Sequence, residues 1–189
     1  MAMVSSCSEE AEKKAPAEPL PYDQITVDGE LSFRLFQNLD RLSGDKYLPG
    51  RVFLTEEQSG GWPGDTEGRT ILGLVCDARA SHKDSGTLKE IISLVPEHLN
   101  SLGYMGPEYG DRLNEQQLSG NGWMLRGLCA YYDWTSDAQV LDWIRSIADN
   151  LFVKGKGMYA KYPIDPSLRV TGEGKESGNI TDTEGNWML

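Results

Sequence analysis

The chain has 189 residues, enough for one domain of ordinary size. Hydrophobic residues make up 39% of it and aromatic residues 9%, so it holds enough apolar material to build a core. Its 18 basic and 29 acidic residues give a formal net charge of -11. No cluster of basic residues stands out in the sequence, so this charge would repel nucleic-acid phosphates and anionic membrane surfaces. We therefore expect a globular protein that does not bind nucleic acid.

The first cysteine, Cys7, follows a short motif of its own. Residues 4–7 read Val-Ser-Ser-Cys and resemble the lipobox of bacterial lipoproteins, and the acidic stretch at residues 8–10 resembles the one that often follows it in surface-exported examples. Only six residues precede Cys7, too few for the apolar segment of a signal peptide. Two explanations stay open: a start site further upstream, or an accidental match. The first predicts a lipid on Cys7 and export to the bacterial periplasm or cell surface.

The segment after Cys7 has the composition of a solvated tether. Residues 11–21 are rich in Ala, Lys, Glu and Pro, which favour an extended and hydrated chain. We assign residues 1–21 to a lipoprotein-like N-terminus with its tether, and residues 22–189 to the folded part. No run approaches the roughly 20 apolar residues that a membrane-spanning helix needs. Any contact with a membrane is therefore expected through the lipid alone.

Apolar residues recur at helical spacing in the first half of the folded part. Residues 31–42 show this spacing and predict a first helix, which Gly44 ends. The same spacing predicts a helix over residues 65–80 and, after a break at residues 81–86, another over residues 88–99. Two helices joined by such a short break form a helical hairpin.

A second hairpin is predicted after a glycine-rich loop at residues 103–110. Helical spacing starts near Leu118 and runs to Tyr132, the break falls at residues 135–137, and the spacing continues over residues 140–151.

The two hairpins resemble each other in sequence. The pair Gly-Leu at residues 73–74 occupies the same place in its hairpin as the pair Gly-Leu at residues 127–128. A repeat of about 55 residues indicates an array or toroid of helical hairpins. Cys76 and Cys129 fall in these apolar stretches, where we expect small buried side chains.

The end of the chain suggests a third hairpin. After a long polar loop over residues 154–178, residues 185–189 read Gly-Asn-Trp-Met-Leu and echo the Gly-Trp-Met-Leu of residues 122–125. We interpret the 189 residues as a fragment whose third hairpin begins where the sequence stops. The alternative is a complete small protein with a frayed or swapped C-terminal segment.

Three segments resemble one family of carbohydrate-active enzymes. Residues 103–105 read Gly-Tyr-Met, and residues 114–121 read Asn-Glu-Gln-Gln-Leu-Ser-Gly-Asn. They are similar to a segment of the beta-L-arabinofuranosidase family, glycoside hydrolase family 127, that begins with a Gly-Tyr-Leu turn and reads His-Glu-Leu-Tyr-Cys-Ala-Gly-His. Residues 60–67, Gly-Gly-Trp-Pro-Gly-Asp-Thr-Glu, resemble the loop that enters an inner helix of that family beside the sugar site. Over residues 28–189 the resemblance implies an all-α fold, the incomplete N-terminal part of a six-hairpin (α/α)6 glycosidase toroid.

The resemblance also limits the chemistry expected of this chain. Both family histidines are replaced, by Asn114 and Asn121, so imidazole contacts to the substrate would become amide contacts. The zinc-bound cysteine nucleophile and the acid/base glutamate of the family would fall beyond Leu189. No cofactor is therefore expected in this segment, zinc is implied only for the missing C-terminal part, and the catalytic residues stay unknown.

Carboxyl groups where loops meet helices are the candidates for glycoside chemistry, which needs two carboxyls flanking the scissile bond. They are Asp65, Glu67, Glu108, Asp111, Glu115 and Asp182. Asp65 and Glu67 have an alternative role, because acidic residues in a first helical turn cap free N–H groups and complement the helix dipole. Glu115, Asn114 and Asn121 offer the donors and acceptors that sugar hydroxyls require, with helix capping and loop stabilisation as the alternative.

Two tryptophans complete the expected substrate-binding set. Trp62 and Trp123 lie near the starts of the first helices, where a toroid has its cleft, and an indole face stacks well on a sugar ring. Both could instead fill the core. The full set expected to bind substrate is Trp62, Asp65, Glu67, Asn114, Glu115, Asn121 and Trp123.

These observations predict the N-terminal part of a glycoside hydrolase that acts on arabinofuranosyl or related glycans, as oligosaccharides or polysaccharides. This segment alone would be inactive. One alternative of the same fold is an unsaturated uronyl hydrolase or a lyase, which would use cations such as Arg51, Arg69 and Arg112 for acidic sugars. Another is a glycan-binding protein of stacked helical hairpins that has no catalytic activity.

Overall fold

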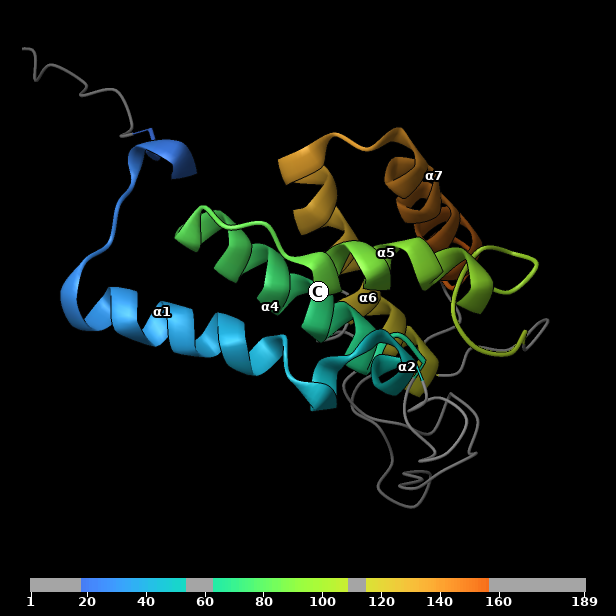
Figure 1. The fold of residues 1–189 in the computed structure, drawn as a ribbon. Helices are drawn as coiled ribbons and strands as arrows, with labels where there is room; N and C mark the ends of the chain where they lie inside the picture. The colour runs from blue at the N-terminus through green and yellow to red at the C-terminus, as the bar shows by residue number, and fades with distance from the viewer. Residues whose placement is uncertain (1–17, 54–62, 109–114, 157–189) are drawn as a thin grey trace, which may run out of the picture.

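The computed structural model describes residues 18–53, 63–108 and 115–156 (Figure 1). Its α-helices are α1 (Gly29–Leu42), α2 (Pro49–Val52), α4 (Asp65–Ser81), α5 (Gly86–His98), α6 (Glu115–Thr135) and α7 (Ala138–Ile147). Short helical turns are η1 (Tyr22–Gln24), η2 (Asp45–Tyr47) and the π-helical η3 (Ala148–Val153). These ranges contain no β-strand, only an isolated bridge between Leu99 and Met105. The expected all-α class is confirmed for this part of the chain.

The breaks inside both predicted hairpins have clear local causes. His82 ends α4 in the left-handed conformation, with φ 54°. Ser85 then caps α5, because its Oγ accepts a hydrogen bond from the backbone N–H of Leu88. In the second hairpin, Asp137 caps α7 by accepting from the backbone N–H of Gln139. The polar residues that interrupt the apolar spacing are therefore the residues that start the next helix.

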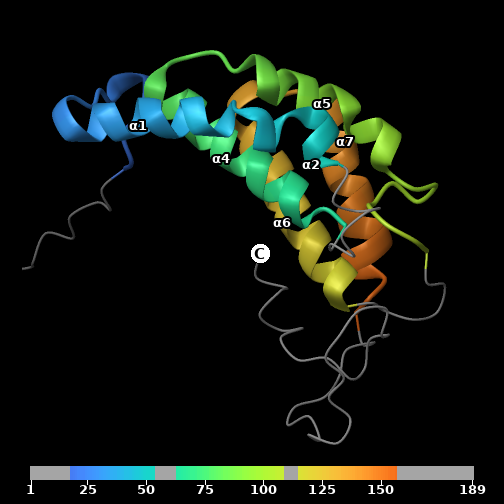
Figure 2. The same ribbon diagram turned by 60° about the horizontal axis from the view of Figure 1, so that its bottom comes forward.

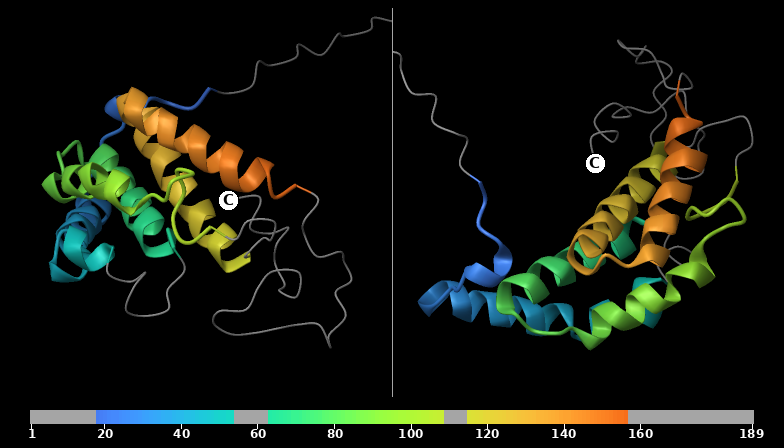
Figure 3. Two further views of the ribbon diagram at one scale, coloured as in Figure 1. Left: turned by 90° about the vertical axis from the view of Figure 1, so that its right-hand side faces the viewer. Right: turned by 90° about the horizontal axis from the view of Figure 1, so that it is seen from above.

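The helices contact one another in the order α1, α4, α6 and α7. Helix α4 packs against α1 on one side and against α6 on the other, and α5 packs against α4 and α2. Figure 2 shows α4 and α6 close together, and Figure 3 shows α6 and α7 side by side as a hairpin. The first helices of the two hairpins thus form the centre of the described structure.

Glycines allow α4 and α6 to approach each other closely. A Cβ atom on Gly68 would lie 2.2 Å from both the carbonyl carbon of Trp123 and the backbone nitrogen of Met124. A Cβ atom on Gly127 would lie 2.5 Å from the carbonyl oxygen of Gly68. Such distances exclude any side chain at these positions, so the two backbones are in direct contact.

The core lies between these helices. Its fully buried apolar side chains, all below 2% exposed, include Ile71, Leu74, Leu88, Ile91, Met105, Leu118, Met124, Leu128 and Ile147. Burying one such side chain contributes about 1.5–3 kcal/mol, so this cluster is the main source of stability. The expectation that Cys76 and Cys129 are buried is wrong, because both are exposed. Each lies on a face of its helix that the described helices leave uncovered.

Most of the N-terminal segment for which we made predictions lies outside the described residues. Cys7 and the tether up to residue 17 lie outside the described residues, and lipidation of Cys7 stays a prediction. The first helical turn of the described residues is η1 at Tyr22–Gln24. In the ranges that the structure describes, no helix is long and apolar enough to cross a membrane.

Candidate functional site

Four of the seven expected substrate-binding residues can be placed with their side chains. Trp62 and Asn114 lie outside the described residues. Glu115 is the first residue of α6, but its side chain is also outside them. Asp65, Glu67, Asn121 and Trp123 remain, and all four lie on α4 and α6.

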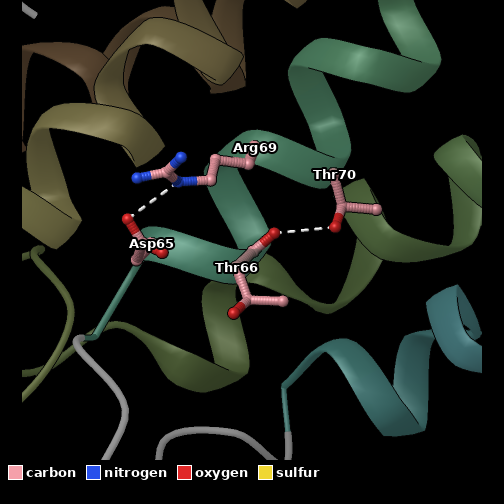
Figure 4. Close-up of polar contacts among 4 residues, drawn as sticks. All are labelled: Asp65, Thr66, Arg69 and Thr70. Carbon is pink, nitrogen blue, oxygen red and sulfur yellow. Dashed lines mark hydrogen bonds and ion pairs between the residues drawn. The ribbon is translucent and has the colours of Figure 1, made fainter.

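Asp65 begins α4 directly after Gly64, whose φ of 89° turns the chain into the helix. The Asp65 carboxylate accepts a hydrogen bond from Nε of Arg69, one helical turn later, at 2.9 Å (Figure 4). The Asp65 side chain is 24% exposed and that of Arg69 is 53% exposed. An exposed pair at this spacing contributes only about 0.3–0.5 kcal/mol to stability. Its main effect is to fix the direction of the guanidinium.

The Arg69 guanidinium in turn lies over Trp123. Its central carbon is 4.0 Å from the centroid of the indole ring, and that of Arg126 is 5.5 Å away. The first distance is typical of a cation–π contact. Asp65, Arg69 and Trp123 therefore form one surface group across α4 and α6, which we name the Arg69 cluster. The spacing of Asp65 and Arg69 was visible in the sequence, but their contact with Trp123 depends on how the helices pack.

Glu67 lies on a different side of α4. Its side chain is completely buried, at 0% exposure, although it belongs to the same first helical turn as Asp65. The structure thus places Glu67 in the interior. Of these two carboxyl groups, only that of Asp65 belongs to the Arg69 cluster.

Asn121 is also completely buried, and its amide is bonded to the backbone. Its Oδ1 accepts from the N–H of Met105 at 2.9 Å, and its Nδ2 donates to the carbonyl oxygens of Met105 and Gln117, each at 3.0 Å. Gln117, one turn earlier, donates to the carbonyls of Met105 and Pro107. The sequence suggested a sugar contact or a structural role for Asn121, and these bonds give it the structural one. It holds the loop after α5 against α6.

The structure describes the side chains of three of the six candidate carboxyls for glycoside cleavage, and their surroundings differ. Asp65 lies on the surface of α4, Glu67 in the interior, and Glu108 in the loop after α5, where it accepts from Oγ of Ser101 at 2.5 Å. Asp111 and Asp182 are outside the described residues. Within those ranges there is also no group of three or more His, Cys, Asp or Glu side chains that could hold a metal ion.

Comparison of the chain with known protein families, with curated proteins and with solved structures found no match.

Proposed function

We propose that this protein is part of a carbohydrate-active enzyme, a glycoside hydrolase that acts on arabinofuranosyl or related glycans. The described helices would contribute groups that bind the sugar, and the catalytic carboxyls would come from elsewhere in the enzyme. The two hairpins would form part of a six-hairpin toroid, with α4 and α6 as inner helices. The observation that carries this proposal is the Arg69 cluster, at the start of α4 and against α6.

The Arg69 cluster offers the three kinds of contact that a sugar ring uses. The Asp65 carboxylate accepts hydrogen bonds from hydroxyls, and the guanidinium donates them. A guanidinium has five N–H donors, and only the one on Nε is used by Asp65. The N–H groups on the two terminal nitrogens are therefore directed by Asp65 and Trp123. The Arg69 guanidinium covers one face of the half-buried Trp123 indole, so the rest of the ring would supply the apolar contact to the C–H face of a sugar.

The described residues provide no zinc site, which the family resemblance implies only for residues beyond this chain. By that resemblance, any step that involves a metal ion would belong to those residues, and this segment would bind the sugar. Its contribution would be to hold and orient a glycan.

The test is binding of arabino-oligosaccharides by titration calorimetry. We expect Arg69→Gln and Asp65→Asn each to weaken binding about tenfold, because a hydrogen bond to a charged group contributes about 1.5–3 kcal/mol. The matched control is the exposed Glu30–Arg34 pair on α1, which has the same spacing and a similar bond of 2.7 Å. Glu30→Gln and Arg34→Gln should leave binding unchanged. Absence of binding by the unmodified protein to neutral glycans would refute the proposal.

The same proposal includes export with a lipid on Cys7, which the lipobox-like residues support. Expression from a gene that includes the upstream start site, in bacteria fed a labelled fatty acid, would test it. We expect label on the protein and none on Cys7→Ser, with Cys76→Ser as the matched control because Cys76 is exposed but lies within α4. Equal labelling of Cys7→Ser would exclude lipidation at Cys7.

A further inference from the structure

A hollow of about 820 Å³ opens beside α4, on the side that faces α1. Its walls come from the C-terminal end of α1, the η2 turn, α2 and the first turns of α4, segments that Figure 1 shows gathered below and beside α4. The lining residues are Asn38, Arg41, Leu42, Asp45, Lys46, Tyr47, Arg51, Thr66, Arg69, Thr70 and Gly73. Apart from Arg69, these residues are distinct from the Arg69 cluster.

The charge of this hollow is opposite to that of the whole chain. The chain carries a net charge of -11, yet four of the eleven lining residues are basic and only Asp45 is acidic. A concave surface lined by one sign of charge concentrates the electric potential and attracts ligands of the other sign. The Arg69 guanidinium is paired with Asp65 and lies over Trp123, so the positive charge of the hollow comes from Arg41, Lys46 and Arg51.

Arg41 is held in place by its neighbours. Its Nε and Nη2 donate to Oδ1 of Asn38 at 3.2 and 2.6 Å, and its Nη1 donates to the hydroxyl of Tyr47 at 2.9 Å. Asn38 in turn donates to the carboxylate of Asp77 at 2.6 Å. One N–H on each terminal nitrogen of Arg41 remains available. Because the guanidinium is already ordered, a ligand would pay little conformational entropy to bind it.

Lys46 and Arg51 supply two further positive charges to the hollow. Both side chains are exposed, and neither forms an ion pair with another residue of the described ranges. The Lys46 ammonium lies 5.5 Å from the centroid of the Tyr47 ring. These two charges would be neutralised by an anion in the hollow.

The wall formed by α4 carries hydroxyl groups. Thr66 and Thr70 lie one turn apart and project to a different side of the helix from Asp65 and Arg69 (Figure 4). The Thr70 hydroxyl donates to the carbonyl oxygen of Thr66 at 2.7 Å, which leaves its oxygen free to accept. Next to the cations, these groups suit a ligand that carries both an anionic group and hydroxyls.

We propose that this basic hollow binds a small hydroxylated anion, through a carboxylate or phosphate held by Arg41, Lys46 and Arg51. A uronic acid unit of a glycan and a sugar phosphate share this chemistry. Binding in the hollow does not require the protein to act on neutral glycans, so it goes beyond the proposed function.

Titration calorimetry with three probes tests this proposal on the unmodified 189-residue chain. The probes are digalacturonate, galactose 6-phosphate and neutral galactobiose. We expect one or both anions to bind and the neutral disaccharide to bind at least tenfold more weakly. The affinity for the anion should also fall as salt is raised, because the contacts are ionic. Binding of digalacturonate alone would assign the hollow to uronates, and binding of galactose 6-phosphate alone would assign it to phosphates.

The variant that locates the site is Lys46→Gln combined with Arg51→Gln. We expect it to lose anion binding at least tenfold while arabino-oligosaccharide binding through the Arg69 cluster is unchanged. The matched control is Arg34→Gln combined with Arg145→Gln, which removes the same charge from exposed positions outside the hollow. Failure of both anions to bind, or an equal loss in the control, would overturn the proposal. Neither result would affect the test of neutral-glycan binding, so the two proposals can fail separately.

Discussion

Gly68 of α4 lies directly against the backbone of Trp123 in α6: a Cβ atom on Gly68 would be 2.2 Å from the Trp123 carbonyl carbon. The neighbour of this glycine is Arg69, whose guanidinium reaches over the Trp123 ring at 4.0 Å. The same contact therefore holds α4 and α6 together and places the cation on the indole. The packing of α4 against α6 and the position of Arg69 over Trp123 therefore both depend on Gly68.

Gly68→Ala should destabilise the protein by about 1–3 kcal/mol or more, because the added methyl group forces α4 and α6 apart. Glycan binding through the Arg69 cluster should fall with it. Chemical denaturation followed by circular dichroism measures the free energy of unfolding. The matched control is Gly86→Ala at the start of α5, where a Cβ atom has nothing within 4 Å and the change should be neutral or slightly stabilising. Equal stability of the two variants would mean that α4 and α6 do not make this contact.

Asn121→Ala should lower the free energy of unfolding strongly. The substitution leaves the buried N–H of Met105 without its Asn121 acceptor, at a cost of about 1–3 kcal/mol, while the Met105 carbonyl keeps its hydrogen bond from Gln117. Gln37→Ala, at an exposed position of α1, is the control and should change stability by less than about 0.5 kcal/mol. If Asn121→Ala instead kept its stability and lost glycan binding, Asn121 would contact the sugar after all.

Helical spacing was sufficient to predict α1, α4, α5, α6 and α7, because each helix is long enough for its apolar face to repeat several times. The sequence did not reveal α2, whose four residues at Pro49–Val52 are too few to show a period. It also placed the start of α6 at Leu118, three residues after Glu115, since the first turn carries mainly polar side chains.

The site was harder to predict because its contacts cross between distant segments. The bonds of Asn121 go to Met105, in a loop that only the folded chain brings to α6. The basic hollow depends on Arg41, Lys46 and Arg51, which are close in the sequence, but helical spacing does not predict that the turns between α1 and α4 bring them to one hollow beside α4. The exposure of Cys76 has the same origin, because an apolar helix face predicts burial only where another helix covers it.

Ser85→Ala should cost about 1 kcal/mol, because it removes the acceptor that caps the N-terminus of α5. Ser85 is buried, so water would not replace the lost bond easily. Ser93→Ala in the exposed part of the same helix is the control, and its effect should be smaller. Thermal unfolding of the two variants side by side would show the difference, and an equal effect would argue against the cap.

Asp77 should make the protein less stable as the pH rises through the titration range of this residue. Burial raises the pKa of the Asp77 carboxyl above its ordinary value, while the hydrogen bond from Asn38 and the charge of Arg41 act in the opposite direction. A raised pKa means that the folded state holds the proton more tightly than the unfolded state does. The contribution of Asp77 to stability is therefore fully present below its unfolded pKa of about 3.9 and is lost as the pH rises through the folded pKa.

Asp77→Asn tests this dependence, because an amide resembles the protonated carboxyl and its oxygen can still accept from Asn38. We expect the variant to gain stability over the unmodified protein between acidic and neutral pH, and to show a constant difference below that window. Gln37→Ala, at an exposed position of α1, is the control, because it removes no titratable group. Denaturant titrations at several pH values supply the free energies. A variant that is less stable than the unmodified protein at pH 7 would mean that Asn38 and Arg41 stabilise the charged form more than burial disfavours it.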